Sequence, residues 1–461
     1  MKKAIIIAGQ TGVGKTKIAY NLANKLNTEI VCIDTIQLYK DLKISANKPS
    51  IFYTKNIKYH NLDILNLEEE LNGSLFANKT REIIKDIWSR DKIPILEGGC
   101  GFYLKMILSG GSSKFSPEEE KKHTQFSLIA KEIIKYDNNF DRTLQRIYKL
   151  DKSTPENCVN QNDTYRLEKR LIDALMFGEG SYDMLRLRES ESRGKNKLDG
   201  DFYNFFLFSE RNILRKKLEV RCEKMIQDGL LKEVSDLLQN KKITPDMIRN
   251  KSLIFLNAYG ILETLRYFTN ILKVSHNKND YLRAYEDKHS KKDKNKNKLH
   301  RDIEKIFYNY LNEFSISNRQ YAKRQATWFK SNTNSCDFLW MDIGIPEEKI
   351  VDDIYRISIS SYEDYKNLLT QEDYLQNKNN YLYTKTKEYT STFEMMKNRQ
   401  VMKRILEKSF EHVEENKETL IEMEKFLNMK GNEESEISYK AENLCKGKEL
   451  DVDLLKKFLN M

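Results

Sequence analysis

Residues 5–16, which read IIIAGQTGVGKT, have the spacing of a phosphate-binding loop. An apolar strand is expected before the loop and a helix after it. In this arrangement backbone N–H groups and the helix N-terminus bind an anion, the lysine adds a positive charge, and the threonine hydroxyl binds a magnesium ion. We therefore predict a phosphate site with Mg²⁺ as its cofactor and Thr16 as the metal ligand. Its residues are Gly9, Gln10, Thr11, Gly12, Val13, Gly14, Lys15 and Thr16.

A carboxylate is expected beside this phosphate site. Asp34 ends a second apolar strand, EIVCID, shortly after the phosphate loop. In a parallel sheet, ligands collect at the carboxyl ends of the strands, so the Asp34 side chain is predicted to face the anion. There it could serve as a general base, or it could be only a turn residue or a helix cap. No later aspartate offers a convincing second magnesium contact of the kind that an ATPase needs.

The order of the predicted elements favours an α/β fold. Apolar runs such as KAIIIAG alternate with segments of helical spacing through residues 1–110, and NFFLFSE resumes the pattern from 204. This alternation predicts a P-loop parallel sheet with flanking helices. The helix that follows residue 210 is interrupted by Gly229, as at a helix end or a turn.

Three parts are predicted along the chain. The P-loop catalytic core comprises 1–110 and 201–335, a helical insert 111–200, and a mostly helical C-terminal extension of unknown role 336–461. Within the core, residues 271–304 are rich in lysine and asparagine and have no apolar period. This composition predicts a disordered loop, and a nonspecific contact with a polyanion is the alternative.

The composition bounds the class of protein. The net charge of +10 fits a polyanionic partner without requiring one. The six cysteines are scattered without a CxxC pair, so neither a zinc finger nor a disulfide framework is expected. No apolar run is long enough to span a membrane, and no targeting peptide precedes the first strand. We expect a monomeric, cytoplasmic protein without a membrane partner, an organelle being the alternative compartment.

Seven motifs make the chain resemble the tRNA dimethylallyltransferases, also called tRNA isopentenyltransferases. In the order of that family, they are GQTGVGKT, DTIQLY, KPS, PILEGGCGFYLK, NDTYRLEKRLIDAL, RCEKMIQDGLLKEV and RQYAKRQATWF. The resemblance covers most of residues 1–110, about 140–268, and 306–330. It covers neither the lysine-rich segment nor the region after about 345.

The resemblance implies a reaction. The bound phosphate would be the diphosphate of dimethylallyl diphosphate, and the acceptor would be N6 of adenine 37 in the anticodon stem-loop of tRNA. Because that amine is a poor nucleophile, the enzyme must stabilise the departing diphosphate and remove a proton. The phosphate loop, magnesium and Arg221 would do the first, and Asp34 would be the general base. Cys100 is a further catalytic candidate, but the family usually has threonine there, so that contact is in doubt.

The resemblance also implies residues that hold the tRNA. The motif after Asp34 would touch the flipped base and its neighbours, while arginine and lysine would contact phosphates. The predicted tRNA-binding residues are Thr35, Ile36, Gln37, Lys48, Arg166, Lys169, Arg319, Lys323 and Arg324. The apolar residues of RQYAKRQATWF are expected to pack against the core rather than to stack on bases.

Three other functions remain open. An enzyme that prenylates free adenine nucleotides would share the phosphate loop and Asp34, but it has less need of the basic RQYAKRQ segment. A P-loop kinase or ATPase would bind a nucleoside triphosphate and transfer a phosphoryl group. A catalytically dead RNA-binding relative is disfavoured by the intact Lys15, Thr16 and Asp34.

Overall fold

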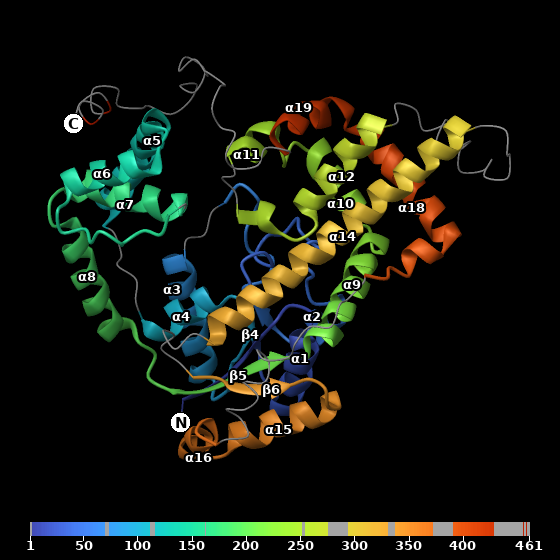
Figure 1. Cartoon of the computed structure of the whole chain (residues 1–461). Coiled ribbons are helices and arrows are strands. Elements are labelled where there is room, and N and C mark those ends of the chain that lie inside the picture. Colours follow the sequence, from blue (N-terminus) through green and yellow to red (C-terminus); the bar gives the residue numbers. More distant parts are fainter. Residues whose placement is uncertain are drawn as a thin grey trace. The chain divides into compact units, whose positions relative to one another are not determined.

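The computed structural model of the chain describes residues 2–69, 73–110, 116–161, 163–250, 254–274, 294–330, 337–371 and 391–427, together with Leu455 and Phe458 (Figure 1). The chain divides into two compact units. The first unit comprises Met1–Lys105 and Asp199–Glu433, and the second Met106–Leu198 and Glu434–Met461. The phosphate loop, Asp34, Cys100 and Arg221 all belong to the first unit.

A six-stranded parallel sheet with the order β3-β2-β4-β1-β5-β6 forms the centre of the first unit. Its strands are β1 (Lys3–Gly9), β2 (Ile30–Ile33), β3 (Tyr59–His60), β4 (Ile95–Gly98), β5 (Asp201–Phe208) and β6 (Leu339–Asp342). The strands β1, β2 and β4 are almost completely buried, as their continuous apolar sequences predict. The predicted α/β fold with a parallel sheet is confirmed.

Helices cover both faces of this sheet. On one face, Ile5 and Ile7 of β1 share a core with α1, α15 and α16. On the other, Phe206 of β5 contacts Phe329 of α14, with ring centroids 4.8 Å apart. The helices that flank the strands are α1 (Lys15–Leu26), α3 (Gly73–Ser89), α4 (Gly101–Ser109), α14 (Lys294–Lys330), α15 (Glu347–Ile359) and α16 (Tyr362–Leu369). Because the strands are parallel, the phosphate loop and Asp34 lie at the same edge of the sheet.

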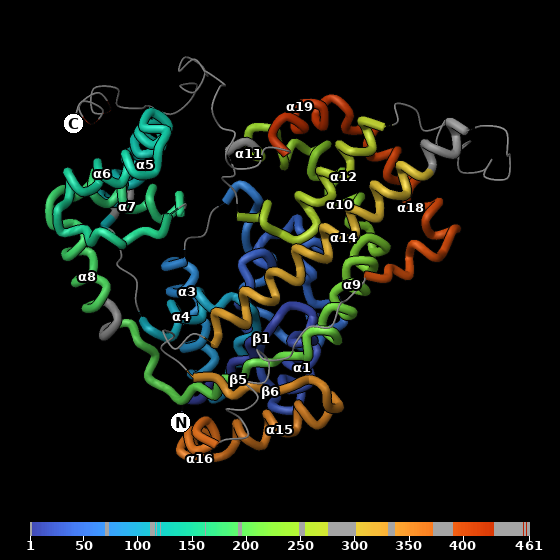
Figure 2. The backbone as a smooth tube through the Cα atoms, viewed as in Figure 1, coloured from blue at the N-terminus to red at the C-terminus, as the bar shows by residue number. Residues whose placement is uncertain are grey.

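Further helices pack around α14, the long helix drawn in yellow and orange in Figure 2. The helices α9 (Arg211–Gln227) and α12 (Ile261–Val274) contact it directly. The unit also contains α2 (Ile51–Asn56), α10 (Leu230–Gln239), α11 (Pro245–Asn250), α18 (Arg399–Glu415), α19 (Lys417–Leu427) and the 3-10 helices η1 (Ile254–Asn257) and η2 (Met395–Lys397). Gly229 has a φ of 111° between α9 and α10, a conformation that favours glycine, and the helix break predicted there is confirmed.

The first unit continues well beyond residue 335, the predicted end of the core. Strand β6 extends the sheet next to β5, α15 packs on α1, and α18 and α19 pack on α10 and α12. No local sequence pattern indicates these contacts, because β6 has only four residues and the helices around it are rich in charge. The predicted extension is therefore part of the fold that carries the site.

Both ends of residues 271–304, the predicted disordered loop, are helical. Helix α12 continues to Val274 and α14 begins at Lys294, while residues 275–293 lie outside the described chain. The prediction is wrong at these ends because α14 has a buried apolar stripe that includes Ile303 and Phe307. The helix extends from this stripe toward its N-terminus, and lysine has a good helix propensity.

The second unit is a cluster of helices. They are α5 (Pro117–Asp137), α6 (Phe140–Leu150), α7 (Thr164–Phe177) and α8 (Ser181–Asn196). Their shared core includes Ile133, Ile147 and Leu171, and it also receives Leu455 and Phe458 from the C-terminal segment. The sequence did not predict that the end of the chain would join this unit.

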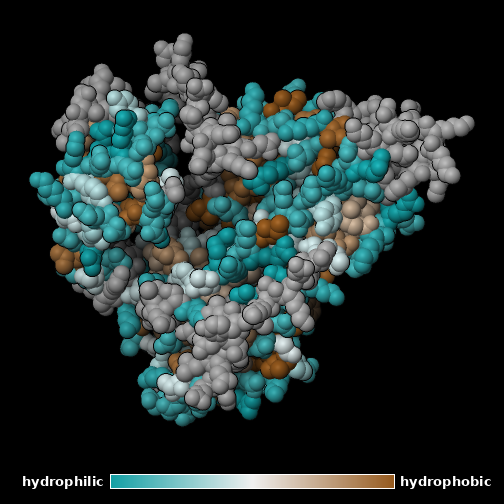
Figure 3. Space-filling view, viewed as in Figure 1, coloured by the Kyte–Doolittle hydropathy of each residue, from teal (hydrophilic) through white to brown (hydrophobic). Residues whose placement is uncertain are grey.

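The residues that Figure 3 colours by hydropathy are mostly hydrophilic, and the hydrophobic areas among them are small and separate. Within the part of the chain that the structure describes, no helix has the length and apolarity that a membrane crossing requires.

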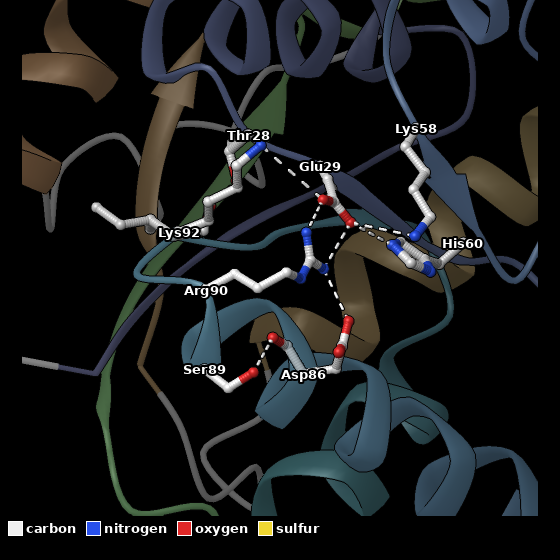
Figure 4. Close-up of polar contacts among 9 residues, drawn as sticks. Thr28, Glu29, Lys58, His60, Asp86, Ser89, Arg90 and Lys92 are labelled. Atoms are coloured by element: carbon white, nitrogen blue, oxygen red, sulfur yellow. Dashed lines mark hydrogen bonds and ion pairs between the residues drawn. The ribbon is translucent and has the colours of Figure 1, made fainter.

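An ion-pair network lies at the other end of β2 from Asp34. The buried carboxylate of Glu29 pairs with Arg90, and it lies 2.8 Å from His60 Nε2 and 3.8 Å from Lys58 Nζ (Figure 4). The hydrogen bond from Arg90 is the main cause that lowers the pKa of Glu29 to about 2. The network thus links residues next to β2, β3 and α3 at the amino ends of the strands.

Candidate active site

The phosphate loop joins β1 to α1 through two glycines in left-handed conformations. Gly12 and Gly14 have φ angles of 84° and 89°. At Gly12 a Cβ atom would lie 2.7 Å from Leu218 Cδ2 of α9, so a larger residue would push against that helix. Within the described chain, no side chain caps the N-terminus of α1. The N–H groups of Lys15 and Thr16, where the helix dipole is positive, are therefore available to an anion, whereas that of Lys17 donates to the Gly14 carbonyl oxygen.

Lys15 is held across the loop beside two carboxylates. Its Nζ donates a hydrogen bond of 2.9 Å to the carbonyl oxygen of Gln10. Burial lowers the pKa of Lys15, whereas the negative charges of Glu97 and Asp34 raise it. The lysine therefore brings positive charge to the cavity that the loop borders.

Helix α9 brings a second cation, Arg221, to the phosphate loop. Its Nη1 donates a hydrogen bond of 2.6 Å to Thr11 Oγ1. Its Nε is buried without a hydrogen-bond partner among the described residues. A buried donor of this kind is costly unless a ligand accepts its bond. The structure thus brings the predicted Arg221 to the predicted anion site with an unused donor.

Glu97, near the end of β4, lies against the predicted metal ligand. Thr16 Oγ1 donates a hydrogen bond of 3.3 Å to Glu97 Oε1, and Glu97 is only 4 % exposed. Burial raises the pKa of Glu97, and the charge of Lys15 opposes this change. The sequence analysis missed this carboxylate. The signal was present, because PILEGG places it at a strand end, as EIVCID does for Asp34.

Asp34 follows β2 and lines the same cavity as the phosphate loop. Its Oδ1 accepts a hydrogen bond of 2.9 Å from the N–H of Ile36. Within the described chain, Oδ2 accepts no hydrogen bond from the protein. The adjoining Thr35 and Ile36 are half-buried. One oxygen of the carboxylate therefore fixes its position, and the other is open to a substrate.

Gln37 is buried beside the cavity, and one atom of its side-chain amide has no hydrogen-bond partner among the described residues. Its Nε2 donates a hydrogen bond of 3.4 Å to the carbonyl oxygen of Asn47. Its Oε1 is buried without a partner in the described part of the chain. A buried acceptor without a partner is costly, so this oxygen is suited to accept a bond from a ligand.

The loop after Asp34 is held by Glu233 of α10. The Glu233 carboxylate accepts hydrogen bonds from the backbone N–H groups of Lys43, Ile44 and Ser45 at 2.8, 2.7 and 2.9 Å. Glu233 was not predicted as a site residue, although it lies in the family motif RCEKMIQDGLLKEV. This contact explains how α10 positions the loop.

Lys48, predicted to contact tRNA, is turned toward the chain itself. Its ammonium group donates to the carbonyl oxygens of Tyr39 and Lys40 and pairs with Asp63. Lys48 still lines the cavity. Its observed contacts brace the loop, and its contact with tRNA stays a prediction.

Helix α14 ties the phosphate loop to the glycine turn after β4. Gln325 Oε1 accepts a hydrogen bond of 2.7 Å from the Thr11 N–H, and Nε2 donates one of 3.2 Å to the Gly99 carbonyl oxygen. A Cβ atom at Gly99 would lie 2.0 Å from Gln325 Nε2, so this close approach needs glycine. Gln325 was not predicted as a site residue, because the charged residues of RQYAKRQ indicated only a contact with tRNA.

Cys100 in this glycine turn is half-buried, and burial raises the pKa of its thiol to about 12. The thiol is therefore neutral at physiological pH and is neither an activated nucleophile nor a base. It can act only as a weak S–H donor at the position where the family usually has threonine.

A cavity of about 320 Å³ unites these groups. Its lining includes Thr11, Lys15, Thr16, Asp34, Gln37, Lys48, Glu97 and Arg221. The hydroxyl and carboxylate oxygens of Thr16, Asp34 and Glu97 are hard donors, which fit the predicted magnesium ion. No cluster of three His, Cys, Asp or Glu side chains suited to a metal occurs within the described chain. Most ligands of such an ion would then come from a diphosphate and water.

One of the three predicted cations of α14, Arg324, lies near a pair of tyrosines. Lys323 and Arg324 are exposed and Arg319 is half-buried. The Arg324 guanidinium lies 5.9 Å from the ring centroid of Tyr321, which lies 5.0 Å from that of Tyr259. Burial, and then the charge of Asp34, raise the pKa of Tyr321. The sequence analysis did not assign either tyrosine to the site.

Two further predicted tRNA contacts lie on α7, in the second unit. Arg166 is exposed and pairs with Asp163 at 2.8 Å, where Asp163 caps the helix. Lys169 is exposed one turn later. Their contact with tRNA stays a prediction.

Phe329 of α14 is buried in the first unit, as expected for a residue that packs on the core.

A six-stranded parallel sheet flanked by helices, with a glycine-containing loop between its central strand β1 and α1, defines an α/β protein. A family model described as IPP transferase matches residues 37–332, more than half of the chain. The chain therefore belongs to the IPP transferase family, and with it to the tRNA dimethylallyltransferases, which are prenyl-transferring enzymes.

Individual relatives agree with this family. The chain is 28% identical to tRNA dimethylallyltransferase 9 of Arabidopsis thaliana over 382 residues, which cover 77% of this chain and 74% of the relative. It is 32% identical to the tRNA dimethylallyltransferase of Fervidobacterium nodosum over 249 residues, 54% of this chain and 75% of the relative. A solved eukaryotic dimethylallyltransferase acting on tRNA has the same fold. Its sequence is 19% identical to this chain. The structural match covers 91% of this chain and 98% of the solved chain, with a TM-score of 0.50.

Proposed function

We propose that this chain transfers the dimethylallyl group of dimethylallyl diphosphate to N6 of adenine 37 in tRNA and releases diphosphate. One observation carries the proposal. The Asp34 carboxylate opens onto the cavity that is also lined by Lys15 and Arg221. Alkylation of an amine by an allylic diphosphate requires a base for the amine proton and a site that stabilises the leaving diphosphate. The cavity offers residues suited to both tasks. The names of the relatives support this choice of donor and acceptor.

The phosphate loop and its cations are proposed to stabilise the leaving group. As the bond from the allylic carbon to oxygen breaks, its electron pair stays on the diphosphate. Lys15, the unused Arg221 Nε and the N–H groups at the start of α1 would face that charge without having to move. A magnesium ion bound to Thr16 would supply further neutralisation of the diphosphate.

Asp34 is proposed to remove the proton from N6. The lone pair of N6 forms the new bond to the allylic carbon, and a proton of the amine passes to Asp34 Oδ2. Because Oδ1 is occupied by the Ile36 N–H, Oδ2 is the oxygen that remains open to the adenine. Proton transfer of this kind typically contributes roughly 100- to 10,000-fold to the rate.

Gln37 is proposed to recognise the flipped adenine. Its buried Oε1 needs a donor, and the exocyclic amine of adenine has a second N–H beside the one that Asp34 removes. Flipping the base out of the loop costs a few kcal/mol, so contacts between the base and the pocket must offset this cost.

The phosphates of the anticodon stem-loop are proposed to contact a separate set of cations. These are Arg319, Lys323 and Arg324, with Arg166 and Lys169 of the second unit.

Incubation of the purified protein with magnesium and labelled dimethylallyl diphosphate tests the proposal. The acceptor is either an unmodified tRNA bearing adenines 36 to 38 or free AMP. We expect label in the tRNA, mapped to adenine 37 by nuclease digestion. Label on AMP alone would assign the protein to nucleotide prenylation. Hydrolysis of added ATP without label on either acceptor would contradict the transferase function altogether.

A further inference from the structure

Glu97 occupies the strand between the phosphate loop and Asp34. Strand β4 lies between β1 and β2, and its register pairs Glu97 with Ile7 on one side and Cys32 on the other. The next residues of those neighbouring strands lead into the phosphate loop and to Asp34. The Glu97 carboxylate therefore lies at the same edge of the sheet as the phosphate loop and Asp34, next to the start of α1.

Within the described residues, this buried carboxylate forms no direct ion pair. Glu97 is 4 % exposed, and within the described residues it forms no ion pair and a single side-chain hydrogen bond, with the Thr16 hydroxyl. Lys15 comes from the same loop, but its Nζ bonds to the Gln10 carbonyl oxygen. A buried charge that lacks a paired cation is strongly unfavourable in a folded protein. The charge of Lys15 is therefore nearby, but among the described residues no cation forms a direct ion pair with Glu97.

A divalent cation would satisfy both residues. In its hydrogen bond to Glu97 the Thr16 hydroxyl donates its proton, so its lone pairs are directed away from the carboxylate and can bind a metal. Mg²⁺ takes oxygen ligands and is usually held by one or two carboxylates together with substrate phosphates and water. The cavity beside these residues is the one proposed to receive the diphosphate.

We propose that Glu97, together with Thr16, binds the divalent cation that accompanies the diphosphate. The inference rests on the proposed function for the identity of that anion. The two carboxylates at this edge of the sheet then have different roles. Asp34 accepts the proton of the amine, and Glu97 binds the metal ion.

The test is a titration of the full-length protein with Mn²⁺ in the presence of inorganic diphosphate, with bound metal read by electron paramagnetic resonance. Glu97→Gln keeps the shape of the side chain and an oxygen that can accept the Thr16 hydrogen bond, but removes the charge. We expect the affinity for Mn²⁺ to fall about 10- to 100-fold, the range seen when a conserved metal-supporting group is removed. In the absence of metal and diphosphate, the variant should melt at the same or a higher temperature than the wild type. An unchanged affinity for Mn²⁺ would overturn the inference.

Two further variants keep the test decisive. Glu82→Gln, on the exposed face of α3, should bind Mn²⁺ as the wild type does. If Glu97→Gln does not fold, Glu97→Asp replaces it. The shorter side chain withdraws the carboxylate, so its affinity for Mn²⁺ should still fall, and an affinity equal to that of the wild type would again contradict the inference.

Failure of this inference is distinguishable from failure of the proposed function. If the wild type labels tRNA but Glu97→Gln binds Mn²⁺ normally, the transferase function stands and the metal assignment fails. If Mn²⁺ binding depends on Glu97 but the wild type labels no tRNA, the metal assignment stands and the proposed reaction fails.

Discussion

The side-chain oxygen of Gln325 accepts a hydrogen bond of 2.7 Å from the N–H of Thr11, so helix α14 holds the phosphate loop directly. The contact is reinforced from the loop, because Gln10 Nε2 donates a hydrogen bond of 3.3 Å to the Ala322 carbonyl oxygen of the same helix. The other end of the Gln325 amide binds Gly99. The basic helix that is proposed to contact tRNA therefore also fixes the site at which the diphosphate would bind.

Gln325→Met should impair catalysis as well as folding stability. The substitution keeps the size of the side chain but leaves the Thr11 N–H and the Gly99 carbonyl oxygen without partners. Orphaned buried groups of this kind cost about 1–3 kcal/mol each. We expect kcat/KM for dimethylallyl diphosphate to fall by about tenfold or more, since about 1.4 kcal/mol corresponds to a factor of ten. Steady-state kinetics with saturating tRNA measures this change.

A matched variant lies on the same helix. Gln320 is exposed, so Gln320→Met should leave kcat/KM within twofold of the wild type. A similar small effect for Gln325→Met would show that α14 does not position the phosphate loop for catalysis.

Asp34→Ala should abolish prenyl transfer while tRNA affinity stays within a few-fold of the wild type. The variant lacks the base, so the rate should fall by roughly 100- to 10,000-fold, whereas the cations that face the RNA are unchanged. Single-turnover transfer and filter binding of tRNA measure the two quantities separately. Asp41→Ala changes an exposed carboxylate of the same loop and should retain full activity. Weak tRNA binding by Asp34→Ala, combined with near-normal turnover, would assign Asp34 to RNA binding instead.

Arg324→Glu should weaken tRNA binding in a salt-dependent manner. The side chain is exposed beside Tyr321, where a guanidinium can reach a phosphate. Loss of one phosphate contact should make the plot of log affinity against log salt concentration shallower by about one unit. Binding titrations from low to physiological salt measure this slope. The control is Lys85→Glu, an equal charge reversal on an exposed residue of α3. Identical affinities for Arg324→Glu and the wild type at every salt concentration would remove this face of α14 from the interface.

The sequence predicted the parts of the site whose signals are local. The phosphate loop is a contiguous motif between an apolar strand and a helix, and Asp34 ends the next apolar run, so strand geometry alone brings them together. Contacts across long separations in sequence were not predicted. Thr16 and Glu97 are 81 residues apart, and Thr11 and Gln325 are 314 apart. In each case the residue type is ordinary for its segment, and only the tertiary structure supplies its partner.

The same distinction explains the errors in the fold. Strand β6 is a strand because it pairs with β5, and its four residues carry too little local pattern to be recognised. The lysine-rich start of α14 is helical because it continues a helix whose buried apolar stripe begins further along the chain. Composition alone could not predict either outcome, since both depend on packing against distant segments.

Acid should destabilise the first unit through Glu29. Its pKa is lowered from 4.5 to about 2 in the folded chain, chiefly by Arg90. A carboxylate with a lowered folded-state pKa stabilises the protein fully above its unfolded pKa, and the stabilisation is lost as the pH falls from about 4.5 toward 2. The difference between 4.5 and about 2 corresponds to a contribution of roughly 3–4 kcal/mol to the free energy of unfolding, at about 1.4 kcal/mol per pH unit. Urea unfolding at pH 7 and pH 3 measures this loss.

Glu29→Gln isolates the contribution of this carboxylate. The variant should be less stable than the wild type at pH 7, because the neutral amide bonds more weakly with Arg90. It should also lose less free energy of unfolding between pH 7 and pH 3, because it has no carboxylate to protonate at this position. Glu82→Gln, exposed on α3, should follow the wild type across the same range. If Glu29→Gln and the wild type lose the same free energy between the two pH values, the Glu29 network does not determine the acid sensitivity of the fold.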